Sequence, residues 1–155
     1  MLEVGDVAPG FSLLDADMDE FELDRERGQH HVVLFFYPRA KTPGCTLQAT
    51  ELSDQESAFA RNACIVVGIS PDEVNTNAAF RDGEGLALRL LSDEDGEVCR
   101  QYGVYRAPTA KGGRIGVERS TFIIDRDGVI RHILRDVSPR GHAAEVLHLV
   151  RQLDT

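Results

Sequence analysis

The sequence predicts an α/β protein with a central mixed sheet flanked by helices, and three observations support this fold class. Two near-continuous apolar runs, 31–37 and 64–69, are typical of strands buried on both faces. The segment between them has helical periodicity, and this strand–helix–strand order implies a right-handed crossover between parallel strands. Nearer the C-terminus, a tight turn at 125–128 separates two further apolar runs and predicts an antiparallel hairpin.

The length, net charge and cysteine content of the chain indicate its domain number, its partners and its compartment. A chain of 155 residues is long enough for one domain, 1–155, with a real hydrophobic core. The formal net charge of −9 argues against nucleic acid and anionic membrane surfaces as partners. The acidic N-terminal segment shows no signal peptide, and no apolar run reaches membrane-spanning length. Three cysteines without a Cys-x-x-Cys pair argue against a disulfide scaffold and a zinc site, and they fit a reducing, cytoplasmic setting.

The first half of the chain alternates short apolar runs with turn and helix signals. Residues 5–24 place apolar runs on both sides of an acidic turn, which predicts an N-terminal β-hairpin. The strand 31–37 follows and is stopped by Pro38. A helix is expected from 42 to about 62, because apolar residues recur there at helical spacing, and the second buried strand comes directly after it.

The second half continues with alternating elements. The stretch 70–73 has the pattern of a capping box with Pro71 at the first helical position, so a helix is expected to begin there. The expected elements are this helix to about 84, a strand 86–91, a short helix 96–102, a mobile loop 107–116, strands 116–124 and 129–134, and a last helix from 138. This order matches a thioredoxin-like α/β sandwich with an N-terminal β-hairpin.

Cys45 is the strongest candidate for chemistry, because it stands where the first buried strand passes into a helix. Thr42 followed by Pro43 is typical of an N-cap and a first helical residue, so Cys45 falls at the third helical position. Backbone N–H groups there lack intrahelical partners, and the helix dipole favours the thiolate over the thiol. The simpler alternative is that Cys45 is a small apolar residue of the core, as many free cysteines are.

These residues resemble the signature of a known family. Pro38-x-x-x-Thr42-x-x-Cys45 is similar to the active-site motif of the peroxiredoxins, and the stretch 37–46 resembles their bacterioferritin comigratory protein (PrxQ) subfamily. Three further stretches, 68–70, 91–93 and 119–125, support a likeness that spans nearly the whole chain. The resemblance implies a thiol-dependent peroxidase, and nothing in the sequence asks for a metal, flavin or nucleotide cofactor.

Reduction of a peroxide by a thiol needs a thiolate, an aligned oxygen, and hydrogen-bond donors for the departing oxygen. In this chain Cys45 is the expected nucleophile, and the hydroxyl of Thr42 can reach sulfur or peroxide. The backbone N–H groups of Gly44 and Cys45 can point at the oxygens, and Pro38 can shield the sulfur from water.

Two further site residues follow from the resemblance alone. It implies that Arg119 stabilises both the thiolate and the leaving oxygen, and that Gln48 gives a supporting hydrogen bond. Without the resemblance, Gln48 is equally well interpreted as a solvated helix residue. Arg39 and Lys41 are interpreted as solvated surface charges.

The product on the enzyme is a sulfenic acid, and its reduction leaves three routes open. Many members of the resembled subfamily use a second cysteine five residues on, where this chain has Thr50. The remaining reductants are an external thiol (thioredoxin, glutaredoxin or a small thiol), Cys99 after local unwinding, or Cys64 in its buried strand. We favour the external thiol, which makes the protein a one-cysteine peroxidase, as a monomer or weak homodimer.

Other classes of function fit parts of the sequence. A peroxide sensor or redox relay would use the same residues, whereas a thioredoxin-like interaction domain or holdase chaperone would not need Pro38, Thr42, Cys45 and Arg119 together. A dithiol–disulfide oxidoreductase is disfavoured because Cys-x-x-Cys is missing. The adjacent histidines 30–31 are interpreted as residues at a strand mouth, since no other His or Cys stands at metal-ligand spacing.

Overall fold

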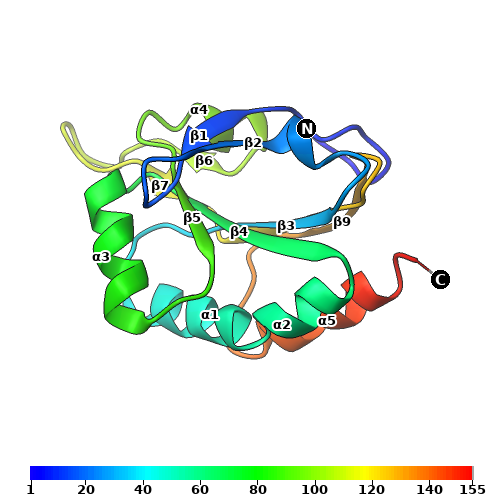
Figure 1. Ribbon diagram of the computed structural model, residues 1–155. Coiled ribbons are helices and arrows are strands. Elements are labelled where there is room, and N and C mark those ends of the chain that lie inside the picture. Colours follow the sequence, from blue (N-terminus) through cyan, green and yellow to red (C-terminus); the bar gives the residue numbers. More distant parts are fainter. Residues whose placement is uncertain (155) are drawn as a thin grey trace.

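A five-stranded mixed sheet forms the centre of the computed structural model, which describes residues 1–154 (Figure 1). Its strands, in the spatial order β5-β4-β3-β8-β9, are β5 (Arg89–Ser92), β4 (Cys64–Ser70), β3 (His31–Phe36), β8 (Ser120–Ile124) and β9 (Ile130–Leu134). Strand β3 is parallel to β4 and antiparallel to β8. The predicted parallel pair, the predicted hairpin and the α/β class are therefore confirmed.

Different elements cover the two faces of this sheet. One face carries α1 (Pro43–Asp54), α2 (Glu56–Arg61) and α5 (His142–Arg151), with α3 (Val74–Glu84) at the edge next to β5, as Figure 1 shows. The other face carries β1 (Ser12–Leu14), β2 (Glu20–Glu22), the 3-10 helix η1 (Leu23–Glu26), α4 (Glu97–Gln101), β6 (Tyr105–Arg106) and β7 (Gly116–Val117). The sheet thus separates two apolar cores.

Strand β3 supplies side chains to both cores. Val33 and Phe35 belong to the cluster under α1, α2 and α5, whereas Val32, Leu34 and Phe36 belong to the cluster on the opposite face. Successive side chains of a strand point to opposite faces, so both sets are buried only when both faces are covered. This is the physical reason for the continuous apolar run in the sequence.

Three predicted helix boundaries are wrong. The helix expected to reach about 62 is two helices, because the backbone at Gln55 departs from helical geometry (φ −101°, ψ 7°) between α1 and α2. The capping box does not form, since Ser70 ends β4 and its hydroxyl donates to the Asp72 carboxylate at 2.9 Å. The last helix begins at His142, after Gly141 in the left-handed conformation, and not at 138.

The strand predicted for 116–124 is also divided, with consequences for the site. Residues 116–117 pair with β6, whereas Ser120 begins β8 and pairs with Phe36 at the end of β3. Arg119 lies in the break, directly before β8. The strand predicted for 86–91 starts later, at Arg89.

The pair of adjacent histidines has a structural explanation. His31 is buried, its Nδ1 accepts the backbone N–H of Arg126 at 3.1 Å, and its Nε2 lies 3.0 Å from a carboxylate oxygen of Asp154. The imidazole therefore joins the start of β3 to the C-terminal segment.

Within residues 1–154, no helix combines the length and the apolar character needed to cross a bilayer.

Gly68 offers a test of how tightly the helix-covered core is packed. A Cβ at this position would lie 2.6 Å from Cζ of Phe35 and 2.9 Å from Cδ2 of Leu90. We expect Gly68→Ala to lower the free energy of unfolding by about 1–3 kcal/mol, because the buried ring cannot move aside freely. Urea denaturation measures this change.

The matched control is Gly83→Ala on α3, where an added Cβ meets nothing within 4 Å. Alanine has the higher helix propensity, so this variant should gain roughly 0.5–1 kcal/mol. Equal stability of Gly68→Ala and the wild type would contradict the packing described here.

Candidate active site

Cys45 occupies the third position of α1, as the sequence predicts. Thr42 precedes the helix in an extended conformation (φ −77°, ψ 154°), and Pro43 is its first residue. The loop 37–42 carries the chain from the carboxyl end of β3 to this point, so the helix begins at the edge where parallel strands end. The side chain of Cys45 is 1% exposed.

A guanidinium from a distant part of the chain contacts the cysteine. Nη2 of Arg119 lies 3.3 Å from Sγ of Cys45, and Nη1 of the same side chain donates to Oε1 of Gln48 at 2.6 Å. A Cβ on Gly44 would lie 3.3 Å from Nη2 of Arg119, so the glycine leaves space for the guanidinium. The structure therefore brings Arg119, Gln48 and Cys45 together.

Gln48 is fully buried, so its interpretation as a solvated helix residue is wrong. Its side-chain oxygen fixes one edge of the Arg119 guanidinium. Its Nε2 has no hydrogen-bond partner within the described part of the chain. A buried donor without a partner is costly, and this one lies one helical turn from Cys45.

Thr42 and Pro38 stand next to the site without a bond to the sulfur. The Thr42 hydroxyl donates to the backbone carbonyl of Arg39 at 2.9 Å, and the carbonyl of Pro38 accepts from Nη2 of Arg114 at 3.1 Å. Because a hydroxyl hydrogen can rotate, the Thr42 hydroxyl can donate to another acceptor in place of the Arg39 carbonyl. Arg39 and Lys41 are exposed, as the sequence predicts.

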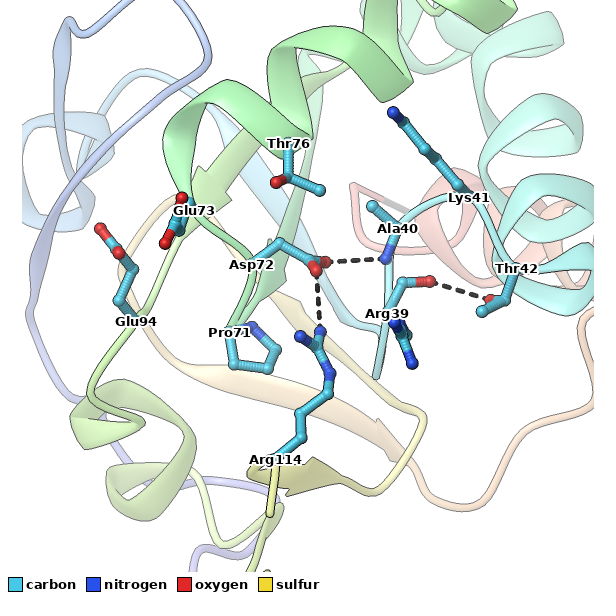
Figure 2. Close-up of a pocket in the computed structure, with 10 residues that line it drawn as sticks. All are labelled: Arg39, Ala40, Lys41, Thr42, Pro71, Asp72, Glu73, Thr76, Glu94 and Arg114. Carbon is cyan, nitrogen blue, oxygen red and sulfur yellow. Dashed lines mark hydrogen bonds and ion pairs between the residues drawn. The ribbon is translucent and has the colours of Figure 1, made fainter. Parts of the chain in front are cut away.

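A polar groove of about 710 Å³ opens beside the loop before α1 (Figure 2). It is lined by Arg39, Ala40, Lys41, Thr42, Pro71, Asp72, Glu73, Thr76, Glu94 and Arg114. Figure 2 shows Asp72 bonded both to the backbone of Ala40 and to Arg114. Local sequence patterns do not reveal this pair, because Asp72 falls in the expected capping box and Arg114 in the expected mobile loop.

The other two cysteines lie in different parts of the fold from Cys45. Cys64 begins β4 and pairs with His31 at the start of β3, whereas Cys45 follows the other end of β3. Six residues of strand span roughly 20 Å. Cys99 is on α4 and belongs to the apolar cluster on the opposite face of the sheet from Cys45.

The environments of these two thiols keep them protonated. Burial raises the pKa of Cys64 to about 12. Burial, followed by the negative charge of Asp93, also raises the pKa of Cys99. Because the thiolate is the nucleophile, the raised pKa values disfavour reaction at both side chains.

Known proteins resemble this chain over most of its length. The AhpC/TSA family matches residues 4–133 of the chain. Peroxiredoxin Bcp of Escherichia coli K12 is 40% identical over 152 residues, which are 97% of each sequence. The crystal structure of peroxidoxin BcpB from Mycobacterium tuberculosis superposes with a TM-score of 0.92 at 35% identity and covers 100% of both chains.

A further structure shares the fold. It is that of the bacterioferritin comigratory protein of Xanthomonas campestris, described for its alkyl peroxide reduction activity; it has a TM-score of 0.86 at 28% identity and covers 97% of this chain and 96% of its own. The match over most of the length, together with the relatives at these identities, makes the assignment plain: the chain belongs to the AhpC/TSA family, as a thiol-dependent peroxidase among the peroxiredoxins of the Bcp (PrxQ) type.

Proposed function

We propose that Cys45 is the residue that reacts with the peroxide and that Arg119 is the cation that assists it. The observation that supports this proposal is the 3.3 Å contact between the Arg119 guanidinium and the Cys45 sulfur at the N-terminus of α1. A guanidinium and a helix N-terminus both favour negative charge on a nearby atom. The same donors can take over the charge that develops on the departing oxygen.

The reaction proceeds in one displacement. The Cys45 thiolate attacks one oxygen of the peroxide, an S–O bond forms as the O–O bond breaks, and the departing oxygen takes a proton and leaves as water or an alcohol. Thr42 and the N–H groups of Gly44 and Cys45 hold the peroxide in line, while Pro38 limits the access of water. Gln48 orients Arg119 through its bond to Nη1.

The sulfenic acid is then reduced by an external thiol, in the manner of a one-cysteine enzyme. Support comes from Thr50 in place of a resolving cysteine, and from the distance and raised pKa of Cys64 and Cys99. The first thiol forms a mixed disulfide with Cys45 and releases water, and a second thiol frees the enzyme. Thioredoxin, glutaredoxin and small thiols are the candidate donors, and a cytoplasmic site of action fits the free cysteines.

Both hydrogen peroxide and organic hydroperoxides are proposed substrates. The alkyl peroxide reduction activity named for the Xanthomonas campestris relative supports the organic class. We propose that the protein acts as a monomer or weak homodimer, without nucleic acid or a membrane as partner, in keeping with its net charge of −9.

The role of Arg119 is tested by Arg119→Lys. Lysine keeps the charge, but it cannot contact Cys45 and Gln48 with two fixed donors. The expected result is a loss of about 100-fold in kcat/KM for hydrogen peroxide, the size typical of removing one transition-state donor. Stopped-flow kinetics measure it, with Arg131→Lys on β9, whose side chain pairs with Asp125, as the control.

The one-cysteine assignment is tested by Cys45→Ser, Cys64→Ser and Cys99→Ser. Turnover with dithiothreitol should vanish in the first variant and stay nearly unchanged in the other two. Intact mass after one equivalent of hydrogen peroxide and a sulfenate trap should show a single adduct on Cys45. Loss of two hydrogens without an adduct would reveal an internal disulfide, and one reaction followed by a stall would favour a sensor.

A further inference from the structure

Two side chains hold the loop that positions Cys45. The N–H of Ala40 donates to Oδ2 of Asp72 at 2.7 Å, and the carbonyl of Pro38 accepts from Nη2 of Arg114 at 3.1 Å. The same Nη2 lies 2.7 Å from Oδ1 of Asp72. The ion pair between Asp72 and Arg114 therefore contacts the backbone of this loop at two points, of which Figure 2 shows the one at Ala40.

The two partners differ in how firmly they are fixed. Asp72 is buried, with 4% of its side chain exposed, and accepts a further hydrogen bond from the hydroxyl of Ser70 at 2.9 Å. Ser70 in turn accepts from Nδ2 of Asn77 at 3.2 Å, which ties the carboxylate to β4 and α3. The side chain of Arg114 is 40% exposed and comes from the loop between β6 and β7. Arg114 is thus the residue of this ion pair whose side chain can move away from its partner.

The loop also contains a strained residue. Lys41 has a φ of 69°, in the left-handed region that side chains with a Cβ disfavour. It stands between Ala40, which is bonded to Asp72, and Thr42, which precedes α1. Such a conformation persists only where the surrounding contacts hold it, so loss of the contacts at Pro38 and Ala40 favours rearrangement of the loop.

The buried sulfur sets a different requirement for each half of the catalytic cycle. A peroxide is small and must meet Cys45 while the sulfur faces Arg119. A reducing thiol is bulkier and must approach the sulfur in line, yet Cys45 is only 1% exposed. The two reactions therefore favour two arrangements of the loop 38–42.

We propose that Asp72 and Arg114 form a latch that sets the balance between these arrangements. With the latch closed, the loop holds Cys45 for reaction with peroxide. With the latch open, the loop moves and admits the reducing thiol. Asp72 and Arg114 are positioning residues, since neither touches the reacting atoms. This inference rests on the proposed reduction of Cys45 by an external thiol.

The test separates the two half-reactions in Arg114→Ala. Oxidation of Cys45 by hydrogen peroxide is followed in a single turnover, and reduction of the resulting sulfenic acid is followed by consumption of thionitrobenzoate. Loss of one partly exposed ion pair should shift the balance between the two arrangements by about fivefold, so it should slow the first rate and raise the second by factors whose product is about five. Opposite changes are the signature of a latch, because a simple loss of structure would lower both rates.

Two further variants sharpen the result. Asp72→Asn keeps an acceptor for Ala40 but removes the charge, and should shift both rates in the same directions as Arg114→Ala. Arg114→Lys keeps the charge, so its rates should fall between those of Arg114→Ala and the wild type.

The chain contains a matched control. Arg89, the first residue of β5, pairs at 2.7 Å with the buried Asp15 directly after β1, and 39% and 8% of the two side chains are exposed. Arg89→Ala should leave both half-reactions unchanged. Equal behaviour of Arg114→Ala and Arg89→Ala, or a fall in both rates of Arg114→Ala, would overturn the latch. Failure of wild-type Cys45 to form a sulfenic acid would instead remove the proposed function on which the latch depends.

Discussion

A guanidinium held 3.3 Å from a buried sulfur is the interaction on which the site depends. It needs a helix that begins at the carboxyl end of β3 and an arginine that directly precedes β8, the neighbouring antiparallel strand. Gly44 leaves the space between them, and Gln48 fixes the far edge of the guanidinium. Such an arrangement concentrates positive charge at the sulfur, as the proposed reaction of Cys45 with peroxide requires.

The same sheet that builds the site also isolates the other thiols. Cys64 lies at the opposite end of the parallel strands, and Cys99 lies under α4 on the opposite face. Burial raises the pKa of both thiols, which disfavours their reactive thiolate forms. An odd number of cysteines therefore does not require a disulfide, which fits the proposed single reactive position at Cys45.

Sequence patterns predicted the elements where local chemistry and burial agree. The apolar run of β3, the Thr42–Pro43 helix start and the turn before β9 were all placed correctly. The capping box at Ser70 failed because the buried Asp72 and Asn77 engage its hydroxyl in a network that no local pattern reveals. The prediction of one continuous strand through Arg119 is wrong because its two halves pair with different strands.

The sequence by itself determined the fold class, the third helical position of Cys45 and, through resemblance, the candidate roles of Arg119 and Gln48. These features depend on periodicity and on residues close together in the chain. Only the tertiary structure decided that Gln48 is buried, that Cys64 and Cys99 are remote, and that Asp72 and Arg114 hold the loop before α1. The physical reason is that these contacts join segments distant in sequence, and their geometry is set by packing across the sheet.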